Sequence, residues 1–282
     1  MNSSKKPLLI AAIGDSITAG FHIASDLNMF LRMWFGRKQS WFSEITRRLE
    51  DKIPVISHNF STAGSELTYN FFSPFLGRLY NITSMIGQVD EVLRLPLFPE
   101  IVLIWTGHNE LNWTIRKEKD FSKITAQFRQ EFQKQLERLC GRALEQNRKA
   151  AIIVFEFISI RVLFHIRELA AKAREENPKL FPYFEKGYQM FESIKPEFKE
   201  QTIRLADMMN AEMEEAVRFC AQKYQSGKLQ IVYSDSLSKM STDSLEDITD
   251  VDGWHPSAKG QRQLAEAAWP VVQKQLDFLL YS

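Results

Sequence analysis

Short apolar runs alternate with longer stretches in which apolar residues recur at helical spacing. Five runs have strand character, at residues 8–13, 55–60, 100–106, 150–157 and 230–235. Between them the spacing predicts helices over 41–49, 82–93, 121–147 and 205–224, and a last helix that Ser257 caps. Strands that alternate with helices favour a parallel sheet covered on both faces. The pattern therefore predicts an α/β protein, a three-layer α/β/α sandwich with a central parallel sheet of about five strands.

The first apolar run ends abruptly at Gly14, and the polar pair Asp15 and Ser16 follows. A hydroxyl is thus presented at the carboxyl end of a strand, the edge of an open α/β sheet at which ligands bind. Such a stretch is also typical of an ordinary strand-to-helix turn in which Ser16 only caps the helix. Ser16 is a candidate nucleophile that needs a partner.

Candidate partners lie at the other end of the chain. Asp252 precedes His255 by three positions, and Gly253 and Pro256 favour a turn between and after them. Ser16, Asp252 and His255 could form a nucleophile, an orienter and a base, as in serine hydrolases. The competing carboxylates of this region are Asp235, Asp243, Asp247 and Asp250. If the two ends meet, the chain forms one domain.

Two further residues follow the second and third apolar runs. Gly64 permits close approach of the backbone, so that its N–H can point at a developing oxyanion, and the Asn109 amide can donate to the same oxygen. A turn glycine and an asparagine that satisfies a loop are the structural alternatives. These residues suggest an oxyanion-binding site without establishing one.

Taken together, these stretches resemble the four separated blocks of the SGNH, or GDSL-type, hydrolases. The matching segments are Gly14-Asp15-Ser16-Ile17, Asn59-Phe60-Ser61-Thr62-Ala63-Gly64, Gly107-His108-Asn109-Glu110 and Asp252-Gly253-Trp254-His255-Pro256. The resemblance implies a flavodoxin-like hydrolase fold, a single domain over 1–282, and a serine esterase that works through an acyl-enzyme. It assigns Ser16, Asp252 and His255 to catalysis. It also builds the oxyanion hole from the backbone N–H groups of Ser16 and Gly64 and the Asn109 amide.

The third block departs from the family pattern at two positions. Glu110 stands where the family usually has aspartate, and His108 stands where a small or hydroxylated residue is more common. His108 is a competing base, or a histidine that satisfies a loop. Activity is expected to fall as pH drops through the ordinary pKa of histidine, about 6.5.

The aromatic residues bear on the substrate. Two apolar stretches rich in phenylalanine, 27–35 and 71–80, follow the nucleophile and glycine blocks, and they either pack in the core or line an acyl groove. Residues 158–202 predict a helical insertion, either a lid or a surface helix pair. These features favour lipid-type esters, as for a lysophospholipase or lipase. A carbohydrate O-acetyl esterase and a catalytically idle binding protein are the alternatives.

The amino-acid composition limits the kinds of partner and cofactor that the chain is expected to bind. With 36 basic and 35 acidic side chains, the chain gives no reason to expect nucleic acid or an anionic membrane. No zinc, ATP or dinucleotide motif is present, so no metal or cofactor is predicted. Cys140 and Cys220 fit buried free thiols. Without a convincing signal peptide or a membrane-spanning stretch, we expect a cytoplasmic enzyme of small-molecule esters, while secretion without such a signal remains open.

Overall fold

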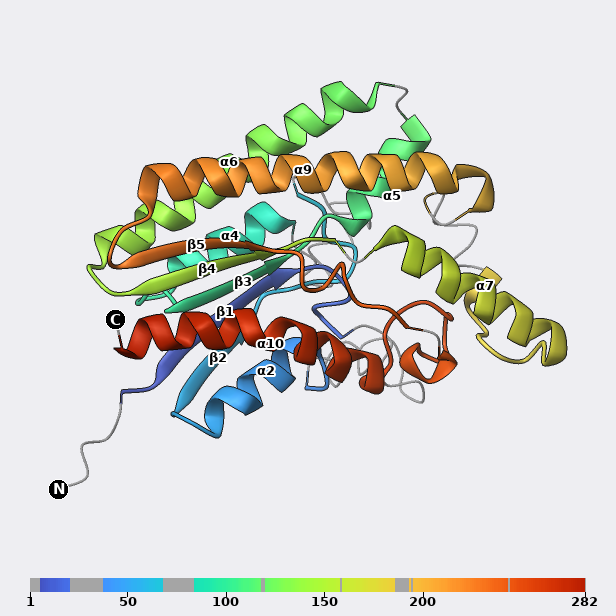
Figure 1. Cartoon of the computed structure of the whole chain (residues 1–282), viewed down its shortest axis with the longest axis horizontal. Coiled ribbons are helices and arrows are strands. Elements are labelled where there is room, and N and C mark those ends of the chain that lie inside the picture. Colours follow the sequence, from blue (N-terminus) through green and yellow to red (C-terminus); the bar gives the residue numbers. More distant parts are fainter. Residues whose placement is uncertain are drawn as a thin grey trace.

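The computed structural model describes residues 6–20, 38–67, 84–117, 120–157, 159–185, 193, 195–242 and 244–281. One sheet lies at its centre (Figure 1), with strands β1 (Leu8–Gly14), β2 (Val55–Asn59), β3 (Ile101–Trp105), β4 (Ala150–Phe155) and β5 (Leu229–Ser234). All neighbouring strands are parallel, and their order is β2-β1-β3-β4-β5. The predicted α/β fold is therefore confirmed, with the flavodoxin-like strand order.

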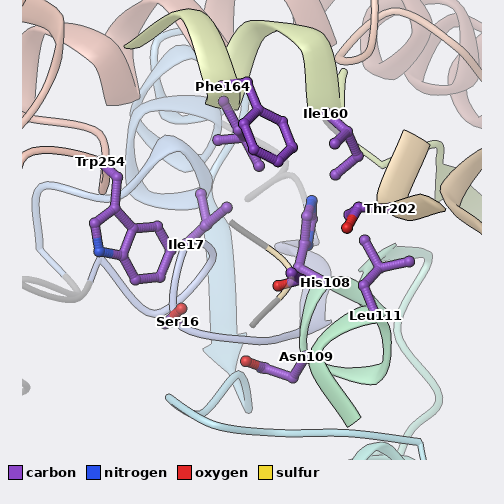
Figure 2. A pocket seen from close by; sticks show the side chains of 11 residues that line it. Ser16, Ile17, His108, Asn109, Leu111, Ile160, Phe164, Thr202 and Trp254 are labelled. Atoms are coloured by element: carbon purple, nitrogen blue, oxygen red, sulfur yellow. The ribbon is translucent and has the colours of Figure 1, made fainter. Parts of the chain in front are cut away.

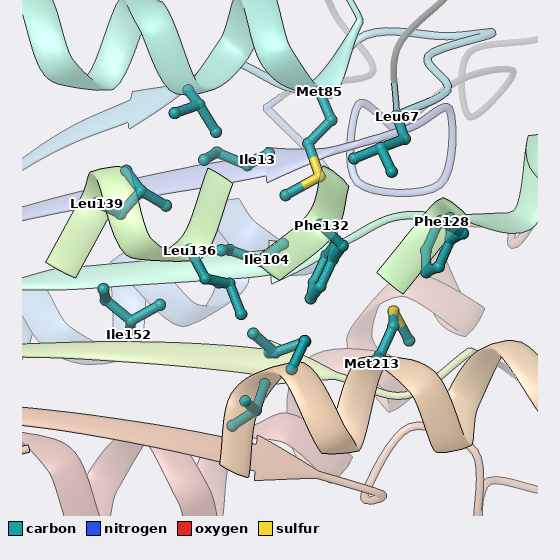
Figure 3. Packing of buried hydrophobic residues seen from close by; sticks show 14 of the residues in the cluster. Ile13, Leu67, Met85, Ile104, Phe128, Phe132, Leu136, Leu139, Ile152 and Met213 are labelled. Carbon is teal, nitrogen blue, oxygen red and sulfur yellow. The ribbon is translucent and has the colours of Figure 1, made fainter. Parts of the chain in front are cut away.

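Helices cover both faces of the sheet (Figure 1). One face carries α4 (Met85–Arg94), α6 (Phe121–Glu145) and α9 (Lys199–Tyr224), and the other carries α2 (Trp41–Glu50) and α10 (Ala258–Tyr281). Alternate side chains of each strand point to opposite faces. Ile104 of β3 thus packs under α6, as Figure 3 shows, while Leu103 joins the core beneath α2 and α10. This alternation produces two separate hydrophobic cores.

Two further helices lie beyond the carboxyl ends of the strands. α5 (His108–Lys117) begins directly after β3, and α7 (Ile160–Glu176) follows β4 (Figure 1). Short 3₁₀ turns at Pro196–Phe198 and Leu245–Asp247 complete the described elements. The carboxyl edge of the sheet is consequently surrounded by helices and by the loops that carry the candidate site.

Most element boundaries differ from the sequence-based expectation by one to three residues, and two differences are of another kind. The sequence analysis considered a loop position for His108 and Asn109, whereas both lie in the first turn of α5. Helix α9 begins at Lys199 rather than at Leu205, since Thr202 and Ile203 already belong to its buried face. Residues 27–35 and 71–80, Asp243, and positions 158, 186–192 and 194 of the insertion lie outside the described residues.

The strand order places the functional loops together. β2 lies on one side of β1 and β3 on the other, so the chain changes direction across the sheet between these strands. Ligands bind at such a switch point because the loops on either side diverge and leave a crevice. The segments that follow β1, β2 and β3 carry Ser16, Gly64 and Asn109, the last of these in the first turn of α5.

Candidate active site

Ser16 lies in a turn directly after β1. Gly14, the last residue of the strand, pairs with Trp105 of β3, and residues 15–20 form the turn. The Asp15 Oδ1 atom accepts the backbone N–H of Ile17 at 3.1 Å. Asp15 rather than Ser16 therefore satisfies this turn, and the Ser16 side chain is available for other contacts.

Ser16, His255 and Asp252 form one chain of hydrogen bonds. The Ser16 Oγ atom lies 3.0 Å from His255 Nε2, and His255 Nδ1 lies 2.5 Å from Asp252 Oδ2. Both His255 and Asp252 are 3% exposed. When Nδ1–H donates to the carboxylate, the Nε2 lone pair is left to accept the serine proton. The structure thus brings together the three residues predicted from opposite ends of the sequence.

The loop that carries Asp252 and His255 closes on itself. Asp252 Oδ1 accepts the backbone N–H groups of Trp254 at 3.1 Å and His255 at 3.0 Å. Thr249 N–H donates to the His255 carbonyl at 2.8 Å, which closes the loop at its base. Asp252 therefore orients the imidazole and also shapes the turn on which that imidazole sits.

Helix α7 and the segment after it support this turn. Gly253 has a φ of +77°, and a Cβ atom there would lie 3.1 Å from Ala170 and from Phe181. The Tyr183 N–H also donates to the Val251 carbonyl at 2.9 Å. The described part of the 158–202 insertion thus packs directly against the Asp252–His255 turn.

The competing carboxylates are placed elsewhere. Asp235 pairs with Lys239 at 2.5 Å, Asp247 pairs with Lys259 at 3.2 Å, and Asp250 is exposed. Asp252 is thus the carboxylate of this group that contacts His255.

Gly64, on the loop after β2, and Asn109, in the first turn of α5, belong to two segments that are hydrogen-bonded to each other. Gly64 has a φ of +73°, a left-handed conformation that favours glycine. Nearby, Thr62 N–H donates to the Gly14 carbonyl at 3.1 Å, and Asn109 Nδ2 donates to the Ser65 carbonyl at 2.9 Å. That bond uses one of the two N–H groups on the Asn109 nitrogen. The glycine loop is therefore held between the end of β1 and the start of α5.

Two buried glutamines hold the nucleophile turn, and the sequence analysis did not identify them. Gln88 of α4 accepts the Gly14 N–H at 2.7 Å and donates to the Gly14 carbonyl at 2.9 Å. On the opposite face, Gln261 of α10 donates to the Ile17 carbonyl at 3.1 Å and accepts the Trp41 N–H at 2.8 Å. The available signal was a glutamine among the apolar positions of each helix.

His108 is committed to Asp15. Its Nδ1 atom lies 2.8 Å from Asp15 Oδ2, and its ring packs between Trp105 and Phe157. Asp15 is fully buried. The pair links the turn of Ser16 to the first residue of α5, directly before Asn109. His255, not His108, is the histidine that contacts the Ser16 hydroxyl.

Glu110 is half-buried beside the glycine loop, where its Oε1 atom accepts the backbone N–H of Leu67. Burial raises the pKa of its carboxyl from 4.5 to about 8, and the charge of Glu66 adds to the rise. A carboxyl group whose pKa is raised into the neutral range thus lies beside the site.

A cavity of about 40 Å³ opens beside Ser16. In Figure 2, Ser16 and Asn109 lie along one side, Ile160 and Phe164 lie opposite, and Trp254 and Thr202 lie at the two ends. Most of the lining is apolar, and the indole of Trp254 also packs on the His255 ring at 3.8 Å between centroids. The candidate nucleophile therefore faces a small hydrophobic chamber.

Within the described ranges, no group of three or more histidine, cysteine, aspartate or glutamate side chains is arranged to hold a metal ion. None of the described helices is both long enough and apolar enough to cross a bilayer.

A flavodoxin-like sheet with a serine, a histidine and an aspartate at its carboxyl edge defines the class of α/β serine hydrolases. The sequence matches the family described as GDSL-like Lipase/Acylhydrolase over residues 10–268, and the chain belongs to this family. It is therefore an ester-bond hydrolase. No curated protein sequence matches the chain significantly.

Solved structures of the same fold include TesA, a carbohydrate esterase and a lipase. TesA is 14% identical, with a TM-score of 0.51 over 95% of this chain and 99% of that one. A family two carbohydrate esterase from Clostridium thermocellum is 16% identical, with a TM-score of 0.54 over 97% of this chain and 66% of that one. The lipase Lip_vut3 from a goat rumen metagenome is also 16% identical, with a TM-score of 0.50 over 93% and 96% of the two chains. At these identities the likeness shows the fold alone.

Proposed function

We propose that this protein hydrolyses carboxylic esters through a covalent acyl-enzyme on Ser16. The observation that carries the proposal is the continuous chain from Ser16 Oγ to His255 Nε2 and from His255 Nδ1 to Asp252 Oδ2, at 3.0 and 2.5 Å. This geometry has a nucleophile within reach of a base and a base oriented by a third group.

In the proposed mechanism, His255 takes the Ser16 proton as Oγ attacks the ester carbonyl carbon. The negative charge that develops on the carbonyl oxygen is held by the Ser16 and Gly64 N–H groups and by the Asn109 amide. His255 then gives its proton to the leaving alcohol oxygen. Water, activated by the same imidazole, attacks the acyl-enzyme and releases the acid. Asp252 stays ionised and stabilises the imidazolium.

For the substrate, we propose a lipid-type ester with an apolar acyl group. The support is the hydrophobic wall beside Ser16, which includes Leu111, Ile160 and Phe164. Such a wall gains free energy from burying methylene groups, about 0.8 kcal/mol for each. The two phenylalanine-rich stretches that the sequence analysis connected with an acyl groove lie outside the described residues.

A second candidate is a carbohydrate O-acetyl esterase, and the size of the cavity favours it. When cavity volume is measured in the same way, a cavity that holds one water molecule has about 10–15 Å³. A cavity of about 40 Å³ therefore holds only a few non-hydrogen atoms. An acetyl group fits this volume, whereas a fatty-acyl chain would have to extend beyond the described cavity.

Hydrolysis of p-nitrophenyl esters of increasing acyl length distinguishes the lipid-type ester from the acetyl ester as substrate, with Ser16→Ala as the matched variant. We expect Ser16→Ala to lower kcat by a factor on the order of 10⁴ or more and to leave the fold intact. A rise in kcat/KM with acyl length would support the lipid-type ester, and activity confined to acetyl esters would support the second candidate. Equal rates in both proteins would exclude Ser16 as the nucleophile.

A further inference from the structure

One buried hydroxyl in the cavity beside Ser16 has no role in the mechanism above. The Thr202 side chain, in the first turns of α9, lines this cavity and is 1% exposed. Among the described residues, its Oγ1 atom has no hydrogen-bond partner. In a helix, a threonine hydroxyl usually bonds a backbone carbonyl of the preceding turn, and this one does not. It is a polar atom kept inside the cavity wall.

The surroundings of Thr202 make the unpaired hydroxyl costly. The neighbouring wall includes Leu111, Ile160 and Phe164, and the polar residues His108 and Ser193 also line the cavity (Figure 2). Burial of a hydroxyl without a hydrogen bond carries a free-energy cost, because the hydrogen bonds that the group makes to water are lost and not replaced. A ligand that brings an oxygen to this position recovers that cost, and a purely apolar ligand does not. The position therefore discriminates between ligands that are otherwise of the same shape.

The mechanism indicates which part of an ester reaches Thr202. His255 must protonate the leaving alcohol, so the alcohol lies on the side of the cavity near the Asp252–His255 turn. Trp254, the neighbour of His255 in sequence, marks that end, and Thr202 lies across the cavity from it (Figure 2). The acyl group of the substrate therefore points toward Thr202.

We propose that Thr202 is a specificity-determining residue that selects esters whose short acyl group carries a hydroxyl. The Thr202 Oγ1 atom both donates and accepts, so it pairs with a ligand hydroxyl in either sense. This inference rests on the proposed acyl-enzyme function and concerns short acyl groups, which fit the described cavity, rather than the longer lipid-type acyl groups considered above. The apolar wall then holds the carbon chain, and Thr202 holds its oxygen.

The test compares methyl esters of butanoic, 2-hydroxybutanoic and 3-hydroxybutanoic acid. In the wild-type protein, we expect one hydroxy ester to be favoured over butanoate by about tenfold in kcat/KM, the effect of one buried hydrogen bond. Thr202→Val keeps the shape of the side chain and removes the oxygen, so the preference should disappear while butanoate hydrolysis is retained. Thr202→Ser, which keeps the hydroxyl, should preserve the preference.

Thr106→Val is the matched control. The Thr106 hydroxyl is also 1% exposed and without a partner among the described residues, but it does not line this cavity. Its substitution should leave the ratio of hydroxybutanoate to butanoate hydrolysis unchanged. The same loss of preference in Thr106→Val, or no preference in the wild-type protein, would overturn the inference.

Calorimetric binding to Ser16→Ala separates this inference from the proposed function. The variant binds esters without turning them over, so a preference for the hydroxy ester is measured even if the protein hydrolyses none of these esters. Loss of that preference in the double variant Ser16→Ala/Thr202→Val supports the role of Thr202. Equal affinities for the hydroxy and plain esters in Ser16→Ala contradict it, whatever the hydrolysis assay shows.

Discussion

At the scale of single residues, Asp252 has two separate tasks, one for each carboxylate oxygen. Oδ2 pairs with His255 Nδ1, and Oδ1 accepts two backbone N–H groups of its own turn. An asparagine can perform the second task but not the first, because its amide nitrogen would donate to His255 and favour the wrong tautomer. The two tasks are therefore separable by substitution.

We expect Asp252→Asn to lower kcat by a factor of about 10⁴ while the protein stays folded, as for the same change in other serine hydrolases. Ester hydrolysis measures the first effect, and circular dichroism with thermal unfolding measures the second. Asp250→Asn, at an exposed position of the same loop, is the control and should keep full activity. A kcat within tenfold of wild type in Asp252→Asn would remove Asp252 from the proposed mechanism.

Glu110 links stability to pH. Its pKa in the folded protein, about 8, lies well above the ordinary 4.5 because of burial and the nearby charge of Glu66. As pH rises from 4.5 toward 8, the unfolded chain loses this proton and the folded protein keeps it. The contribution of Glu110 to the free energy of unfolding therefore falls as pH rises through this window. Above about pH 8 that contribution no longer changes.

Glu110→Gln should remove this dependence, since an amide does not titrate and its oxygen can still accept the Leu67 N–H. Relative to wild type, the variant should gain on the order of a few kcal/mol in free energy of unfolding from pH about 4 to pH about 9. Urea unfolding of both proteins across this range measures the difference. Parallel pH profiles would show that Glu110 ionises normally.

At the scale of elements, α7 acts as a support for the catalytic turn. A cluster of buried apolar side chains joins this helix to the segment after it and to the loop before the turn, and consists of Ile166, Ala170, Phe181, Phe184 and Ile248. Gly253 fits against this cluster because it has no Cβ. The position of His255 therefore depends on a helix that carries none of the three proposed catalytic residues.

Gly253→Ala should lower both stability and kcat. The alanine would have to keep a left-handed backbone conformation that disfavours it. Its Cβ atom would also lie 3.1 Å from Ala170 and Phe181, so the turn must shift. We expect a loss of at least 1 to 2 kcal/mol, on the order of other strained left-handed residues, and a loss of tenfold or more in kcat. Gly141→Ala in α6 has no contact within 4 Å and should instead stabilise the protein by about 0.5–1 kcal/mol. Normal kcat in Gly253→Ala would argue against the supporting role.

At the scale of the whole molecule, the reactivity of the two cysteines indicates whether the core between α6 and α9 is closed. Cys140 and Cys220 are both fully buried and free. A hydrogen bond with Cys220, together with burial, raises the pKa of the Cys140 thiol. In the folded protein, the Cys140 thiol therefore stays protonated, and burial keeps both cysteines from contact with a thiol reagent.

We expect a thiol reagent such as Ellman's reagent to modify neither cysteine in the native protein and to modify both in urea. The rate in native conditions should follow global unfolding, because α6 and α9 must separate before the reagent enters. Absorbance at increasing urea concentration, compared with unfolding by circular dichroism, checks this. Rapid modification of the native protein would indicate local opening of the α6–α9 pair.

The sequence predicted the sheet well because buried parallel strands leave continuous apolar runs, as in Ile101–Trp105. It also selected Ser16 and His255, which are 239 positions apart, because the chemistry of each is carried by a local motif. It did not predict Gln88 or Gln261, whose partners are backbone atoms distant in sequence. The contact between α7 and Gly253 could not be predicted either, because nothing in the sequence of one segment indicates that it packs against the other.

Gln88 and Gln261 hold the nucleophile turn from opposite faces of the sheet through amide groups. Amides neither gain nor lose a proton over the range in which enzymes are assayed. Carboxylates or imidazoles in the same places would loosen the turn on one side of their pKa. The contacts that these two amides make with the turn therefore persist from acidic to alkaline solution, so this part of the support for the serine does not depend on pH.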